Sequence, residues 1–303
     1  MIKKVLITGG TGLIGKRITG LLLEKGYQVA HVSRSKRSGN SPETYVWDLK
    51  KNYLDPAALN DVDAIIHLAG AGVADKRWSE SYKQVILESR IKSTRLLLEG
   101  LQRSNHQVKV FVSASAIGIY PDDQGGRVFD EDGPHADNFL AEVTKAWEQE
   151  VDKISPLGIR TVKFRIGIVL SNSGGALVKM AQPVKYGLGV PLGSGEQFMS
   201  WIHELDLSRM LVFPLEDENL EGVYNAVSPN AKTNAEVTKA IAKSLNKPCF
   251  LPNIPGFLIK LVMGEMSGMV LGGINASSQK IQNTGFEFKF EKLSLALDDL
   301  LAK

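Results

Sequence analysis

Cysteine is almost absent from this chain of 303 residues, because Cys249 is its single copy. One cysteine cannot form an internal disulfide, and cysteine-poor chains are typical of a reducing compartment. The five histidines are not spaced as H-x-x-x-H or H-x-H. Zinc sites draw their ligands from such cysteine and histidine pairs, so we expect no metal site.

Long apolar runs and a strong net charge are also missing. The stretch that comes nearest to a membrane span, residues 254–274, is interrupted by Lys260 and Glu265. The net charge is only +3, and the basic residues are scattered along the chain. A nucleic-acid surface requires clustered lysine and arginine. We therefore expect a cytoplasmic protein that binds neither membranes nor nucleic acids.

In the first half of the chain, short apolar segments alternate with amphipathic ones. This alternation predicts an α/β fold in which a doubly wound parallel sheet, of the Rossmann type, has its ligand crevice at the carboxyl ends of the strands. The predicted strands cover residues 4–8, 28–33, 44–47, 64–68, 109–113 and 160–164. The predicted helices cover residues 12–25, 80–102 and 138–154.

The second half contains more glycine and proline and predicts a smaller C-terminal lobe. We expect a Rossmann domain over residues 1–227, in which residues 167–200 contribute to the substrate side, and a lobe over residues 228–303. Thr233 followed by Glu236 predicts a capping box at the start of a helix. An apolar helical stripe between Phe257 and Leu271 predicts either core packing or the seam of a homodimer.

The segment with the clearest functional meaning is VLITGGTGLIG, residues 5–15. An apolar strand runs into three spaced glycines, and a helical pattern follows directly. Gly9 permits the tight turn, Gly12 lets the backbone approach a pyrophosphate, and Gly15 lets the helix pack against the strand. The positive end of the helix then faces a phosphate. A glycine-rich turn without a ligand is the alternative.

The residues after the second predicted strand favour NADP(H) over NAD(H). An NAD site requires a carboxylate there, but no acid occurs between Tyr27 and Asn40. Ser33 and Arg34 occupy the place instead, followed by Lys36 and Arg37. A guanidinium suits the extra 2′-phosphate, which a carboxylate would repel. The alternative is a solvated basic loop.

Two more segments follow predicted strands and reach the same crevice. Asp48 could accept a hydrogen bond from the adenine amino group, or it could simply cap a turn. The segment Leu68-Ala69-Gly70 contains small residues, which would let its backbone lie against the adenosine ribose. The alternative is a plain βα turn.

These motifs resemble the extended short-chain dehydrogenase/reductase superfamily, and more narrowly its "epimerase family protein" subgroup. The superfamily cues are residues 8–15, 48–49, 67–70, 201–207 and 224–226; the subgroup cues are residues 113–118, 165–170 and 193–198. The lobe from about residue 253 to residue 302 resembles the subgroup's own domain of unassigned function. The cofactor-site residues that the residue patterns and the resemblance imply are Gly9, Thr11, Gly12, Leu13, Ile14, Gly15, Ser33, Arg34, Asp48, Leu49, Leu68, Ala69, Gly70, Arg90, Ser113 and Ile168.

The resemblance also implies a Ser-Tyr-Lys proton relay, which is incomplete in this chain. Ser115 matches the serine that holds the substrate oxygen, and Lys145 matches the lysine. The tyrosine should lie four residues before the lysine, where the chain has Ala141. Tyr120 is our candidate replacement. Each has a structural alternative: a hydroxyl cap for Ser115, a solvated lysine for Lys145 and a packing aromatic for Tyr120. Arg90, where the superfamily often has asparagine, is either a cofactor contact or an exposed helix residue.

The sequence therefore predicts an NADP(H)-dependent oxidoreductase that acts on a small-molecule carbonyl or alcohol. Because the tyrosine is missing, a dinucleotide-binding regulator or scaffold with little turnover is a second hypothesis. A nucleotide-sugar epimerase is a third, although that chemistry also needs the tyrosine and usually retains NAD.

Overall fold

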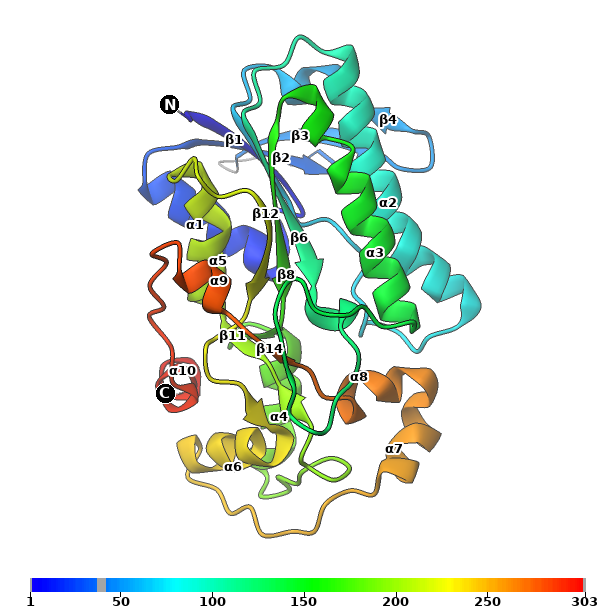
Figure 1. Ribbon diagram of the computed structural model, residues 1–303, viewed down its shortest axis with the longest axis vertical. Coiled ribbons are helices and arrows are strands. Elements are labelled where there is room, and N and C mark those ends of the chain that lie inside the picture. The colour runs from blue at the N-terminus through cyan, green and yellow to red at the C-terminus, as the bar shows by residue number, and fades with distance from the viewer. Residues whose placement is uncertain (1, 37–41, 302–303) are drawn as a thin grey trace.

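The computed structural model describes residues 2–36 and 42–301, and its centre is an eight-stranded sheet (Figure 1). Neighbouring strands run parallel except for β4, which pairs antiparallel with β3. The strands in spatial order are β12 (Gly222–Ala226), β8 (Arg160–Ile166), β6 (Val110–Ala116), β5 (Ala64–His67), β1 (Lys4–Thr8), β2 (Gln28–Ser33), β3 (Glu43–Asp48) and β4 (Tyr53–Leu54). The predicted α/β class and doubly wound sheet are confirmed.

Helices cover both faces of this sheet. On one face, α1 (Leu13–Glu24) and α5 (Glu204–Val212) bury an aliphatic cluster against the central strands. On the other face lie α2 (Glu80–Arg103) and α3 (Phe139–Asp152), which Figure 1 shows side by side. Strands that are apolar on both sides require this double cover, because each face must leave water.

Below the carboxyl edge of the sheet, α4 (Gly175–Lys185), α6 (Asn234–Ser244) and α10 (Leu293–Leu301) share a further apolar cluster. The predicted capping box at Thr233 and Glu236 is confirmed at the start of α6. Three two-stranded pairs link this region: β9 (Ile168–Leu170) with β11 (Trp201–His203), β10 (Phe198–Met199) with β13 (Lys232–Thr233), and β7 (Val128–Phe129) with β14 (Asn275–Ala276).

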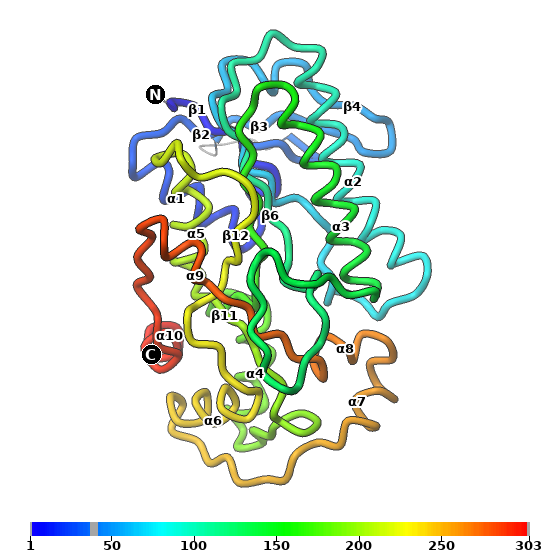
Figure 2. The backbone as a smooth tube through the Cα atoms, viewed as in Figure 1, coloured from blue at the N-terminus to red at the C-terminus, as the bar shows by residue number. Residues whose placement is uncertain are grey.

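The C-terminal segment returns to the main sheet before the chain ends. Figure 2 shows it passing from α7 (Gly256–Met263) and α8 (Gly268–Leu271) up to α9 (Gln279–Gln282), and then back down to α10. Ile281 and Phe286 join the apolar cluster beneath α1 and α5. The domain boundary at residues 227 and 228 stays a prediction. Among the described residues, no helix combines the length and apolar character needed to cross a membrane.

Candidate cofactor and active site

The glycine turn joins β1 to α1 in a geometry that only glycine permits. Gly9 has φ of +71°, and a Cβ there would lie 3.0 Å from the carbonyl carbon of Leu68. At Gly15 a Cβ would lie 2.3 Å from the carbonyl oxygen of Gly9. Gly12 is the N-cap of α1, and no side chain caps this end of the helix. The first turn of α1 also contains no acidic residue, so its N–H groups and positive dipole are available to an anion.

The Thr8 hydroxyl holds the backbone that follows β5 against this turn. Its oxygen accepts the backbone N–H groups of Leu68 and Ala69, each at 3.2 Å. It also lies 2.7 Å from Nδ1 of His67, a side chain that is fully buried. Burial, helped by the positive charge of Arg90, lowers the pKa of His67 to about 3, so this histidine is neutral and structural.

The predicted 2′-phosphate residues stand at the end of β2, next to the glycine turn that follows β1. The two strands pair in parallel, with Lys4 opposite Gln28 and Thr8 opposite Val32, so both end at the same edge of the sheet. Ser33 is partly buried and Arg34 is exposed. Within the described residues, Arg34 forms no ion pair. Arg37 lies outside the described residues.

Asp48 at the end of β3 has a local role. One of its carboxylate oxygens accepts the backbone N–H groups of Lys50 at 2.9 Å and Lys51 at 3.2 Å. The structure therefore favours the turn-cap alternative for Asp48, next to a partly buried Leu49 that packs on the α2–α3 side of the sheet.

Arg90 is partly buried, so it is not the exposed helix arginine of the alternative, and its role as a cofactor contact stays a prediction. Its Nη1 donates to the carbonyl oxygens of Ala71 at 3.1 Å and Ile86 at 2.9 Å. The guanidinium lies 5.2 Å from the ring of Trp147, and burial lowers its pKa to about 10. A Cβ at Gly70 would come within 3.2 Å of it. Arg90 thus shapes the loop that follows β5.

The remaining predicted cofactor residues lie at the carboxyl edge of the sheet or just inside it. Thr11, Leu13 and Ile14 are partly buried in the turn and at the start of α1. Leu13 approaches the N-terminus of α4, because a Cβ at Gly175 would lie 3.8 Å from it. Ile168 opens β9, and its backbone N–H is bonded to the carbonyl of Ser200 at 2.8 Å.

The uncapped N-terminus of α1 and the close approach at Gly9 and Gly15 together fit a dinucleotide. Ser113 differs from most of the predicted cofactor residues in its exposure. It is fully buried, and its hydroxyl donates to the carbonyl of Ala114 at 2.8 Å, which indicates a structural role in β6.

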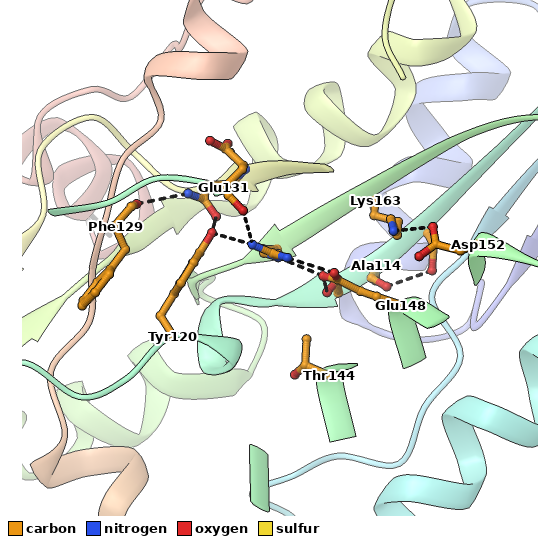
Figure 3. A network of polar contacts seen from close by, with 12 residues as sticks. Ala114, Tyr120, Phe129, Glu131, Thr144, Glu148, Asp152 and Lys163 are labelled. Carbon is orange, nitrogen blue, oxygen red and sulfur yellow. Dashed lines mark hydrogen bonds and ion pairs between the residues drawn. The ribbon is translucent and has the colours of Figure 1, made fainter. Parts of the chain in front are cut away.

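A buried polar network occupies the carboxyl ends of β6, β8 and β12 (Figure 3). Ser115, Arg165 and Asn225 face one another in register on these three strands. Arg165 donates from Nε and Nη2 to the two carboxylate oxygens of Glu148 on α3, at 2.9 and 3.0 Å. The Ser115 hydroxyl also donates to Glu148, at 2.5 Å. Ser115 is therefore a structural donor to a buried carboxylate.

Tyr120 belongs to the same network. Its hydroxyl donates to Oδ1 of Asn225 at 2.8 Å and accepts from Nη1 of Arg165 at 2.9 Å. The ring is fully buried and stacks on Phe129 with a centroid distance of 5.6 Å. Burial raises the pKa of this phenol to about 12, against the opposing effect of Arg165. The packing alternative is thus favoured for Tyr120, which lacks the exposed hydroxyl of a proton donor.

The pKa values of two carboxyl groups in this network, Glu148 and Glu131, are shifted in opposite directions. Burial would raise the pKa of Glu148, but the hydrogen bonds and charge of Arg165 outweigh it and hold the pKa below its usual value. The Glu131 carboxylate accepts the backbone N–H of Asn225 at 2.6 Å, and burial raises its pKa. Sequence reasoning missed both acids. An arginine near the end of a central strand was the available signal, since a buried guanidinium demands a partner.

Lys145 and Ala141 lie on α3 one turn apart. The Lys145 ammonium donates to the carbonyl oxygen of Ala136, and the Ala141 side chain is fully buried. Thr144, the hydroxyl between them, donates to the carbonyl of Leu140 at 2.7 Å. Ser115 and Tyr120 are thus joined through the Glu148–Arg165 pair, whereas Lys145 is bonded to the Ala136 carbonyl outside this network.

Comparison with known proteins agrees with this architecture. Residues 5–226 match the model of the NAD dependent epimerase/dehydratase family, and residues 254–300 match a domain of unknown function, DUF1731. Epimerase family protein SH2119 of Staphylococcus haemolyticus is 34% identical over 99% of both chains. Epimerase family protein SSP1921 of Staphylococcus saprophyticus is 36% identical over 99% of this chain and 100% of its own length. The chain belongs to the NAD dependent epimerase/dehydratase family.

Two solved structures are similar over nearly the whole chain. Human epimerase family protein SDR39U1 (isoform 2), solved with NADPH, has a TM-score of 0.88 and 32% identity, with 98% of each chain covered. A nucleoside-diphosphate sugar epimerase from Corynebacterium glutamicum has a TM-score of 0.81 and 27% identity, covering 99% of this chain and 58% of that one. The resemblance found in the sequence, including that of the C-terminal lobe, is confirmed.

Proposed function

We propose that this protein is an NADP(H)-dependent oxidoreductase acting on a small carbonyl or alcohol substrate. One observation carries the proposal: the uncapped, glycine-lined N-terminus of α1 lies beside Arg34 at the end of β2, in a stretch that contains no acid. An NAD site would place a carboxylate there. The human relative solved with NADPH supports the same choice of cofactor.

Different residues around the turn would bind different parts of the cofactor. The backbone N–H groups that follow Gly12 would hold the pyrophosphate, and Ser33 and Arg34 would hold the 2′-phosphate. Leu68, Ala69 and Gly70 would lie along the adenosine, where Thr8 fixes their backbone. When bound, the reduced cofactor supplies a hydride, and carbonyl reduction then requires one further proton.

This chain differs from a standard Ser-Tyr-Lys relay in the source of that proton. The hydroxyls of Ser115, Tyr120 and Thr144 are bonded inside the protein, and Lys145 donates to a backbone carbonyl. We propose that water supplies the proton. General acid catalysis by a side chain typically contributes about 10²–10⁴-fold, so turnover without one should be slow.

A second candidate, a dinucleotide-binding regulator without turnover, is favoured by the same engaged side chains and by Ala141. Purified protein should be mixed with NADPH and a broad panel of aldehydes and ketones while absorbance at the reduced-nicotinamide band is followed. Substrate-dependent oxidation of NADPH supports the oxidoreductase. Tight NADPH binding with no oxidation across the panel would support the regulator instead.

A further inference from the structure

Arg90 of α2 carries a charge that no carboxylate neutralises within residues 2–36 and 42–301. Its Nη1 donates to two backbone carbonyls, and its Nε and Nη2 donate to no group in the part of the chain that the structure describes. Arg165 is different, because its Nε and Nη2 hold the two carboxylate oxygens of Glu148. A guanidinium that is partly out of water is costly without such a partner. Arg90 therefore lacks the counter-ion that Arg165 has.

The side chains around this guanidinium also supply no negative charge. The indole of Trp147 on α3 lies 5.2 Å from it, and the indole Nε1, which only donates, has no acceptor among the described residues. His67 at the end of β5 is neutral, since burial and the charge of Arg90 lower its pKa to about 3. The phenol of Tyr82 donates to the carbonyl of Gly72 at 2.7 Å. The group that this place lacks is an acceptor with a negative charge.

The contacts of Arg90 place it at the carboxyl edge of the sheet but away from the first turn of α1. A Cβ at Gly70, in the loop that follows β5 and packs on the glycine turn, would lie 3.2 Å from its Cζ. Trp147 belongs to the α2–α3 face, whereas α1 covers the other face. In the sheet order, β5 and β6 lie on the opposite side of β1 from β2, where Arg34 stands. A dinucleotide with its 2′-phosphate at Arg34 and its pyrophosphate at the glycine turn would therefore extend its nicotinamide end toward Arg90.

We infer that Arg90 binds a carboxylate of the substrate, so that the substrates are acidic carbonyl compounds such as 2-oxo acids. This inference rests on the proposed function and names its substrate class. The free Nε and Nη2 of Arg90 form the same planar fork that holds Glu148 on Arg165, and this fork matches two carboxylate oxygens. One guanidinium balances one negative charge, which favours a carboxylate over a dianionic phosphate. Arg90 is partly exposed, and its bonds to the carbonyls of Ala71 and Ile86 hold the fork in place before a ligand binds.

The test uses the full chain, calorimetry and two acids, 2-oxobutanoate and phenylglyoxylate, each paired with its uncharged methyl ester. Binding of NADPH and NADP⁺ is measured first, so that its absence counts against the proposed function separately. Each probe is then titrated into the NADP⁺ complex, in which the oxo group is not reduced. We expect at least one acid to bind about tenfold or more tightly than its ester, because hydrogen bonds to a charged group contribute about 1.5–3 kcal/mol. Equal affinities of acid and ester, or no binding of either acid, would overturn the inference.

Two variants test whether Arg90 sets this preference. Arg90→Gln should lose the preference for the acid while its NADPH affinity is unchanged, and Arg90→Lys should keep part of the preference, since it keeps the charge but not the fork. Arg103→Gln is the matched control, because Arg103 lies at the other end of α2, is 74% exposed and pairs with Glu99 at 3.0 Å. Unfolding curves identify the folded variants, and Arg90→Lys decides the test if Arg90→Gln does not fold. A full preference in a folded Arg90 variant, or a loss of NADPH affinity with the preference intact, would contradict the assignment.

Discussion

Arg165 and Glu148 form a buried two-pronged ion pair that joins β8 to α3 beneath the carboxyl edge of the sheet (Figure 3). The two side chains are 4% and 9% exposed. Through Ser115 and Tyr120 the pair also reaches β6 and the loop after it. One charge pair thus ties the ends of β6 and β8 to α3.

Removing one partner of this pair should destabilise the protein severely. Glu148→Gln leaves the Arg165 charge buried without a counter-ion, a change that typically costs about 3–5 kcal/mol. Thermal or denaturant unfolding measures it. Glu88→Gln is the matched control, because Glu88 forms an exposed pair with Lys92 on α2 and should leave the midpoint unchanged. Equal midpoints for the two variants would contradict the structural role of the Glu148 carboxylate.

The same pair predicts a loss of stability in acid. The pKa of Glu148 in the folded protein lies below its ordinary value of 4.5. The unfolded chain therefore binds the proton more readily, and the contribution of Glu148 is present above pH 4.5 and is lost as the pH falls through the folded pKa. Unfolding midpoints measured between pH 7 and pH 3 should fall more steeply in wild type than in Glu148→Gln. Parallel curves would contradict this origin of the acid sensitivity.

The glycine turn offers a comparison within one helix. In Gly15→Ala the new Cβ would lie 2.3 Å from the carbonyl oxygen of Gly9, so the turn must distort. We expect NADPH affinity to fall by about tenfold or more, together with a loss of about 1–3 kcal/mol from overpacking. Gly20→Ala lies in the same helix, meets nothing within 4 Å, and should stabilise the protein by about 0.5–1 kcal/mol. Calorimetry and unfolding report both effects. Normal NADPH binding by Gly15→Ala would argue against a cofactor at this turn.

Tyr120 should behave as a structural residue. Tyr120→Phe keeps the stacking on Phe129 but leaves Asn225 and Arg165 each without one partner, which should cost about 1–3 kcal/mol. The pH profile of any NADPH-dependent reduction should not move, since the phenol transfers no proton. Tyr53→Phe, at a 46% exposed side chain, is the control for stability. A rate loss of about 10²-fold or more with unchanged stability would instead restore Tyr120 as the general acid.

Arg34 should determine which dinucleotide binds. Arg34→Glu removes the guanidinium and places a carboxylate where the 2′-phosphate would lie. Charged hydrogen bonds contribute about 1.5–3 kcal/mol, so NADPH affinity should fall by about tenfold or more while NADH affinity is kept or improved. Lys243→Glu, an exposed lysine on α6, controls for net charge. An unchanged ratio of the two affinities in Arg34→Glu would place the 2′-phosphate elsewhere.

The strands and helices of the sheet could be predicted because each carries its own local signal. β1 and β2 match their predicted bounds, and α2 begins at Glu80 as expected. The signals were a continuous apolar run for buried strands and an apolar stripe for helices. The glycine turn could also be predicted, because the spacing of its three glycines reflects close backbone contacts within a single strand–turn–helix unit.

The buried network was not predictable in this way, because its members come from distant parts of the chain. Tyr120 bonds to Asn225 and Glu131 bonds to the backbone of Asn225, across separations of 105 and 94 residues. No local pattern distinguishes a phenol that is locked by such partners from one that faces a substrate. The return of Ile281 and Phe286 to the main core was missed for the same reason.

The most direct test of the account is calorimetric titration of the full-length protein with NADPH and with NADH under identical conditions. The geometry at Gly9, Gly12 and Arg34 predicts heat of binding with NADPH and an affinity at least about tenfold higher than for NADH. Tighter binding of NADH, or no heat with either the oxidised or the reduced form of the phosphorylated cofactor, would contradict it.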